Sequence, residues 1–188
     1  MKIAITGGIG SGKSYVCRML ERRGIRVYDS DAAAKRLMNT DPELQSRLQA
    51  LVGVGVYQDD RLCKSVLAQY IIESEIHKQA VNAIVHPAVA RDFLQSGYTW
   101  LESAILFESA FDKRIRFDFI IGVMAPIDIR IKRIMHRDGI TREQALSWID
   151  LQMPQEQVAD RCHFIINNDE KKDLDEQITR LIQIIQNQ

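Results

Sequence analysis

The sequence has few cysteines, no excess charge of either sign and no long hydrophobic run. Its three cysteines, Cys17, Cys63 and Cys162, stand far apart and without metal-site spacing, so we expect buried free thiols in a reducing, cytoplasmic compartment. Lysine plus arginine and aspartate plus glutamate each total 25, and this balance argues against nucleic acid as the main partner. No apolar stretch approaches the length of a membrane span, and the apolar run at the start is too short for a signal peptide.

The remaining composition is that of an ordinary globular protein. Hydrophobic residues make up 46% and charged residues 27% of 188 residues, which suits one compact domain with at most a small insertion. The sequence contains neither an internal repeat nor a low-complexity segment. His86 has no second histidine at ligand spacing, so no metal is assigned to protein histidines.

Residues 7–14 read Gly-Gly-Ile-Gly-Ser-Gly-Lys-Ser, which is the phosphate-binding pattern G-x-x-x-x-G-K-S known as the P-loop. Its glycines let the backbone turn tightly and aim successive N–H groups at anionic oxygens. Lys13 can reach the β- and γ-phosphates of a nucleotide, and the Ser14 hydroxyl can bind Mg²⁺. The nucleotide-binding residues that we predict here are Gly8, Ile9, Gly10, Ser11, Gly12, Lys13, Ser14 and Tyr15.

Short apolar runs typical of strands alternate with amphipathic segments typical of helices. We expect strands near residues 2–6, 25–28, 98–101, 117–124 and 164–166, and mostly helix over 41–95. This alternation predicts an α/β, three-layer fold with a parallel sheet, in which ligands bind beyond the carboxyl ends of the strands. The P-loop, Asp29, Asp31, Glu108 and Asn167 all fall at such ends, which indicates a single active site.

Asp29 and Asp31 follow the second expected strand and precede an alanine-rich helix. A carboxylate beside the γ-phosphate can accept a proton from an attacking hydroxyl, or can hold Mg²⁺ through water. The plainer alternative is a helix cap, from Asp29 or Ser30, and a solvated acid. The nearby P-loop favours the catalytic interpretation for one of the two aspartates.

Positive charge is concentrated in a segment just after the strongest expected strand. The residues are Arg130, Lys132, Arg133, Arg137 and Arg142. Guanidinium groups suit closure over a transferring phosphoryl group, and Gly139 is a candidate hinge between two helices. A solvated basic helix face is the alternative for any one of these arginines.

Two signatures of other nucleotide-binding classes are missing. No obvious strand of four apolar residues ending in a Mg²⁺-binding acid is present, since Asp118 lies within a strand rather than at its end, and no N-K-x-D guanine-reading motif occurs. The sequence therefore favours a small-molecule kinase over a GTPase or a mechanical ATPase.

Pro87 disfavours a helical conformation of His86, so we expect a helix to end at this pair.

The order of these motifs resembles the dephospho-CoA kinase family, and the similarity extends over nearly the whole chain. The segments that carry it are 6–14, 28–31 with Ala33 and Ala34, 86–87, 105–108, 133–138, Gln152 and 165–167. A P-loop alone occurs in many kinases, whereas its combination with D-x-D, H-P, L-x-E and a closing I-x-N is far more selective. The resemblance implies ATP-dependent phosphorylation of the ribose 3′-hydroxyl of dephospho-CoA, giving coenzyme A and ADP, with Mg²⁺.

The resemblance also implies an organisation into three parts, similar to nucleoside monophosphate kinases. These are a P-loop NTPase core at about 1–40, 97–136 and 160–188, a helical acceptor-binding subdomain at 41–96, and a lid at 137–159. It implies that Asp31 is the general base and that Lys13 and the lid residue Arg137 are also catalytic. It places Asn167 near the adenine. The acceptor-binding residues that it implies are Asp29, Asp31, Lys64, His86 and Glu108.

The sequence departs from the family pattern at a few positions. Lys64 stands where the family usually has arginine, which keeps the charge but loses the planar bidentate fork. Ala104 replaces a common proline and Tyr15 a common threonine, and we expect neither change to affect the chemistry.

We expect the protein to be a monomer or a weak homo-oligomer. Two alternatives stay open, a P-loop kinase for another nucleoside, nucleotide or shikimate-like alcohol, and a nucleotide-binding switch without turnover.

Overall fold

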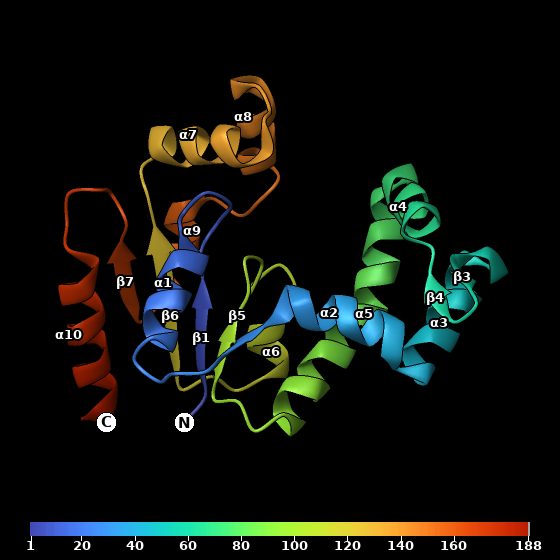
Figure 1. The fold of residues 1–188 in the computed structure, drawn as a ribbon, viewed down its shortest axis with the longest axis horizontal. Helices are drawn as coiled ribbons and strands as arrows, with labels where there is room; N and C mark the ends of the chain where they lie inside the picture. The colour runs from blue at the N-terminus through green and yellow to red at the C-terminus, as the bar shows by residue number, and fades with distance from the viewer. Residues whose placement is uncertain (188) are drawn as a thin grey trace. The chain divides into compact units, whose positions relative to one another are not determined.

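The computed structural model describes residues 1–187 and divides the chain into two compact units (Figure 1). The first unit combines Met1–Tyr28 with Tyr98 to the end of the described chain, and the second is Asp29–Gly97. Across these 187 residues, none of the helices combines the length and apolar character that a membrane crossing requires.

The first unit contains the main sheet and the helices that follow its strands. Its elements are β1 (Ile3–Thr6), α1 (Lys13–Glu21), β2 (Val27–Asp29), β5 (Trp100–Glu102), α6 (Phe111–Arg114), β6 (Phe119–Met124), α7 (Ile127–Asp138), α8 (Arg142–Asp150), α9 (Gln155–Ala159), β7 (Phe164–Asn167) and α10 (Leu174–Gln186). The strand order is β2-β5-β1-β6-β7, and β1 pairs in parallel with both β5 and β6. The parallel α/β sheet predicted from the alternating pattern is confirmed.

The P-loop strand lies at the centre of this sheet. Ile3 is in register with Trp100 of β5 on one side and with Phe119 of β6 on the other. All residues of β1 and β6 are buried, which explains why both runs are apolar without alternation. A central position fixes the carboxyl end of β1, from which the P-loop starts.

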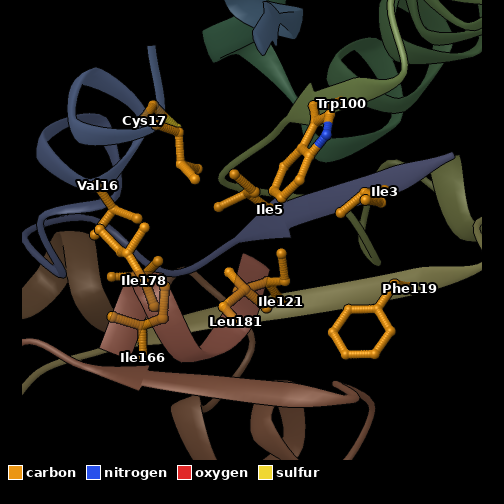
Figure 2. Close-up of a cluster of buried hydrophobic side chains, with 12 residues drawn as sticks. Ile3, Ile5, Val16, Cys17, Trp100, Phe119, Ile121, Ile166, Ile178 and Leu181 are labelled. Carbon is orange, nitrogen blue, oxygen red and sulfur yellow. The ribbon is translucent and has the colours of Figure 1, made fainter. Parts of the chain in front are cut away.

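One face of the sheet packs against α1 and α10 to form the main hydrophobic core (Figure 2). Alternate residues of the strands supply one side, including Ile5 and Ile121, both with no exposed surface. Val16 of α1 and Ile178 and Leu181 of α10 supply the other side. The apolar stripe of the last helix thus anchors the C-terminal segment to the sheet that carries the P-loop.

The opposite face of the sheet packs against the segment that contains α9. Gly122 of β6 lies between Ile121 and Val123, which face the main core, so Gly122 faces the other side. A Cβ added to Gly122 would lie 3.0 Å from Cys162 Sγ. The Cys162 thiol donates to the Val158 carbonyl at 3.1 Å, and burial raises its pKa to about 12. Helices therefore cover both faces, which gives the three layers.

The burial of Cys162 leads to a prediction about thiol reactivity. At pH 8 a thiol with a pKa of about 12 is ionised in only about one molecule in 10⁴, and the thiolate is the reactive form. Cys63, the N-cap residue of α4, and Cys162 are both partly exposed, so we expect a maleimide to label Cys63 and to spare Cys162 because the Cys162 thiol stays protonated. Mass spectrometry of the wild type and of Cys63→Ser measures this, and rapid labelling of Cys162 in the variant contradicts it.

The second unit is mostly helical, as predicted. Its elements are α2 (Ser30–Thr40), α3 (Pro42–Val52), η1 (Val54–Val56), β3 (Tyr57–Gln58), β4 (Arg61–Leu62), α4 (Lys64–Glu73) and α5 (Glu75–Gln95). The short antiparallel ribbon of β3 and β4 was not predicted. Its two central residues, Asp59 and Asp60, have φ values of 48° and 60°, so they form a tight hairpin turn that sequence rules associate mainly with asparagine and glycine.

The prediction that a helix ends at His86-Pro87 is wrong. Pro87 lies inside α5, which continues to Gln95. An internal proline costs a helix about 3 kcal/mol, because it removes one backbone hydrogen bond and its ring crowds the preceding turn. Burial of Val85, Ala88 and Val89 around it offsets that cost, so packing overrides the local preference.

Candidate active site

The P-loop joins the end of β1 to the start of α1 and depends on glycine at crowded positions, as Gly10 and Gly12 illustrate. Gly10 has a φ of 78°, and a Cβ there would lie 2.7 Å from the Arg130 carbonyl oxygen. Gly12 has a φ of 89°, and a Cβ there would overlap the side-chain amide of Asn168. Gly12 is also the N-cap of α1 and offers no side-chain acceptor, so the first N–H groups of the helix stay available for an anion.

Lys13, the first residue of α1, forms an ion pair with Glu102. The two side chains are only 10% and 13% exposed. Glu102 is the last residue of β5, the strand beside β1, so the sheet register brings this carboxylate next to the P-loop lysine. A largely buried ion pair of this kind holds the ammonium group in place until an anionic ligand competes for it.

Glu102 ends a buried strand beside the P-loop strand, and it was not among the predicted site residues. The sequence analysis required four apolar residues before the acid. β5 has only Trp100 and Leu101 before Glu102, because Thr99 interrupts the apolar run. Only the strand order shows that this short strand lies next to the P-loop strand.

Arg133 of α7 and Asn168, just after β7, hold the outer side of the P-loop. The Arg133 guanidinium donates to the carbonyl oxygens of Gly10 and Ser11 at 3.4 and 3.2 Å. The Asn168 side chain donates to the same Ser11 carbonyl at 2.8 Å and accepts from Arg133 at 3.2 Å. These contacts fix the carbonyl oxygens of Gly10 and Ser11 from the outer side of the loop.

Asn168, which was not among the predicted site residues, contacts the P-loop, whereas the role predicted for Asn167 was to lie near the adenine. The backbone of Asn167 exchanges two hydrogen bonds with the Gln177 side chain, at 2.8 and 3.1 Å. Asn168 is buried, and its N–H donates to the Met124 carbonyl at the end of β6. The polar pair after the last strand was the available signal, but the sequence does not show which member faces the loop.

The other basic residues of this segment divide between the loop and the surface. Arg130 is only 5% exposed and donates to the Ile9 carbonyl at 2.9 Å. Burial lowers the pKa of its guanidinium from the ordinary value, although the charge of Glu156 opposes the shift. Arg137 pairs with Asp138 and Arg142 with Asp128, both in exposed ion pairs.

Glu108 and Gln152 connect the base of the predicted lid to the rest of the first unit. The Glu108 carboxylate accepts from the Met153 N–H at 3.0 Å, and the Gln152 side-chain oxygen accepts from the Ile9 N–H at 2.7 Å. Gln152 entered the sequence analysis only through the family resemblance, and no role was predicted for it. Its contact with Ile9 spans 143 residues of sequence, which no local pattern indicates.

The remaining predicted site residues belong to the second unit. Asp29 caps α2, where its carboxylate accepts from the N–H groups of Asp31 and Ala32 at 2.9 Å each. Asp31 lies in the first turn of the same helix with an exposed side chain. Lys64 begins α4, and His86 lies within α5. The structure thus gives the capping role to Asp29 and leaves the Asp31 carboxylate at the surface of this unit.

The donor set around the P-loop fits a magnesium nucleotide. The Ser14 hydroxyl and the Glu102 carboxylate are hard oxygen donors of the kind that Mg²⁺ prefers. Within residues 1–187, no group of three or more histidine, cysteine, aspartate or glutamate side chains could hold a metal by itself. A divalent ion would therefore bind here together with phosphate oxygens, as is usual for Mg²⁺.

Comparison with known proteins gives a consistent result. The model of the dephospho-CoA kinase (CoaE) family matches residues 1–173. A dephospho-CoA kinase of Bacteroides fragilis (strain YCH46) is 41% identical over 189 residues, which cover 97% of this chain and 91% of that protein.

Solved structures support the fold. TT1252 from Thermus thermophilus has a TM-score of 0.78 and 30% identity, and the match covers 98% of this chain and 95% of that one. A dephospho-CoA kinase from Campylobacter jejuni has a TM-score of 0.66 and 20% identity over 99% and 96% of the two chains, and this likeness supports the fold alone. Since a family model covers most of its length and a relative is 41% identical over nearly all of it, the chain belongs to the dephospho-CoA kinase family.

Proposed function

We propose that this chain, as a dephospho-CoA kinase, transfers the γ-phosphoryl group of ATP to the ribose 3′-hydroxyl of dephospho-CoA. The hydroxyl oxygen forms a bond to the γ-phosphorus, the bond from that phosphorus to the bridging oxygen breaks, and ADP leaves. The observation that carries the proposal is the P-loop whose Lys13 pairs with Glu102, in a chain of this family. We expect the reaction in the cytoplasm, where the three free thiols stay reduced.

The P-loop and Lys13 bind the triphosphate and neutralise its developing charge. Lys13 exchanges its ion pair with Glu102 for the β- and γ-phosphates, which frees the Glu102 carboxylate. Ser14 and Glu102 would then hold Mg²⁺, which would supply positive charge against the phosphate oxygens. Positioning and charge stabilisation of this kind supply most of the rate in phosphoryl transfer.

Asp31 accepts the proton of the attacking hydroxyl. Two carboxylates follow β2, but the Asp29 side chain already accepts two backbone N–H groups as the cap of α2. Asp31 has an exposed carboxylate that no capping bond occupies. A general base in this role contributes about 10²–10⁴-fold, less than phosphate binding and alignment together.

The two units divide the substrates between them. The first unit binds ATP, and the second, with Lys64 and His86 on its helices, binds dephospho-CoA. The segment 137–159 acts as a lid that excludes water, so that ATP is not hydrolysed without acceptor. Arg137 exchanges its surface ion pair with Asp138 for the transferring phosphoryl group when the lid closes.

The test of this function is ADP release from ATP and Mg²⁺ with and without dephospho-CoA. We expect release to depend strongly on dephospho-CoA and the product to carry its new phosphate on the ribose 3′-oxygen, as read by ³¹P NMR. Release that depends instead on a nucleoside, a nucleotide or shikimate contradicts the assigned acceptor. Nucleotide binding without release in any mixture indicates a switch protein.

A further inference from the structure

Ile9 is the P-loop residue whose two backbone groups are both bound by side chains from distant segments. Its N–H donates to Gln152 Oε1 at 2.7 Å, and its carbonyl accepts from Arg130 Nε at 2.9 Å. The preceding glycine is packed against the same two side chains, since a Cβ on Gly8 would lie 2.5 Å from Arg130 Nη2 and 3.1 Å from Gln152 Oε1. The Gly8–Ile9 part of the loop is therefore fixed from two directions.

The two side chains come from different elements of the first unit. Arg130 lies in α7, the helix that follows β6, and is 5% exposed. Gln152 lies in the short connection between α8 and α9, inside the segment assigned to the lid. The next residue, Met153, donates its N–H to Glu108 at 3.0 Å. Residues 152 and 153 thus connect the lid segment to the P-loop and to the loop after β5.

We propose that Gln152 is a positioning residue, whose side-chain oxygen sets the geometry of the P-loop from the lid segment. The hydrogen bond to Ile9 holds the first part of the loop in the conformation that receives the triphosphate. Because the bond originates between α8 and α9, a change in the lid segment is transmitted to the P-loop through this side chain. The inference rests on the proposed function, since it concerns how ATP is held for transfer.

A neutral amide suits this role better than a carboxylate would. A glutamate at this position can accept the same hydrogen bond from the Ile9 N–H, so it preserves the contact. It adds a negative charge beside a loop that must bind a triphosphate, and charges close together in a partly buried site repel strongly. Glutamine therefore provides a hydrogen-bond acceptor for the Ile9 N–H that carries no negative charge.

Gln155 provides a matched control. Its side-chain oxygen also accepts from a backbone N–H, that of Ala125 at 3.1 Å, and it lies three residues after Gln152. This bond fixes the segment after β6 and does not involve the P-loop. Replacing Gln155 by alanine removes a bond of the same kind from the same region without releasing the loop.

The experiment compares Gln152→Ala, Gln152→Glu and Gln155→Ala by steady-state kinetics, with the melting temperature measured for each. We expect Gln152→Ala to lower kcat/KM for ATP about tenfold, the scale of one lost hydrogen bond, and to leave KM for dephospho-CoA unchanged. Gln152→Glu should keep the melting temperature of the wild type and raise KM for ATP, more at low ionic strength than at high. Gln155→Ala should stay within about twofold of the wild type.

Two results overturn the proposal. One is a Gln152→Ala enzyme whose kinetic constants match those of Gln155→Ala. The other is a Gln152→Ala enzyme whose activity falls only in proportion to its folded fraction, which marks a purely structural bond. A failure of the proposed function is distinct from both, because the wild type itself would then release no ADP in response to dephospho-CoA.

Discussion

Replacement of Asp31 by asparagine lowers kcat by about 10²–10⁴-fold and leaves the affinity for ATP unchanged. The change removes the proton acceptor for the ribose hydroxyl and conserves the size of the side chain. The P-loop, Lys13 and Glu102 belong to the first unit and keep their contacts, so ATP binds as before. Acceptor-dependent ADP release and isothermal titration with ATP measure the two quantities.

The neighbouring aspartate is the control for this experiment. Asp29 caps α2 with its carboxylate, and asparagine is an equally good N-cap, so Asp29→Asn should retain kcat and stability. Asp29→Ala should lower the free energy of unfolding by about 1 kcal/mol through loss of the cap. An Asp31→Asn enzyme with wild-type kcat, together with a slow Asp29→Asn enzyme, would transfer the proposed base to Asp29.

The parts of the site that the sequence predicts are those within a few residues of one another. The P-loop is a continuous octapeptide, and its geometry follows from glycine at the positions of positive φ, Gly7, Gly10 and Gly12. The capping of α2 by Asp29 was one of two open alternatives, and the structure chooses it over Ser30. In each case the relevant atoms belong to one turn of the chain, so local chemistry determines the outcome.

The parts that the sequence does not predict are contacts between distant segments. Asn168 lies 157 residues from Ser11, and Gln152 lies 143 residues from Ile9. Glu102 contacts Lys13 only because β5 is placed next to β1 rather than at an edge. Strand order is set by the packing of the whole sheet, and a single sequence contains no local signal for it.

The arginine-rich segment shows the same limit within one helix. The sequence analysis treated Arg133 and Arg137 alike, as members of one segment of concentrated positive charge. In the structure Arg133 binds the P-loop carbonyls, whereas Arg137 forms an exposed ion pair with its neighbour Asp138. Four residues span slightly more than one helical turn, and only the turn that carries Arg133 lies close enough to bind the P-loop carbonyls.

Replacement of Lys13 by methionine should have the other large effect, because this lysine has two roles. The substitution removes the cation that binds the β- and γ-phosphates, and the loss of one such charge-stabilising group costs about 10²–10³-fold in kcat. It also leaves the largely buried Glu102 carboxylate without its cation. Breaking a buried ion pair from one side costs about 3–5 kcal/mol in the free energy of unfolding.

The double variant Lys13→Met, Glu102→Gln separates these two roles. Neutralising Glu102 removes the uncompensated buried charge, so most of the lost stability should return in urea unfolding. The phosphate-binding cation is still missing, so kcat should stay as low as in the single variant or fall further, since Glu102 is also a proposed Mg²⁺ ligand. Equal stability of the single and double variants would show that Glu102 is not the buried partner of Lys13 in solution. Recovery of activity in the double variant would contradict the phosphate-binding role of Lys13. The defect of the single variant would then come from the unpaired Glu102 carboxylate alone.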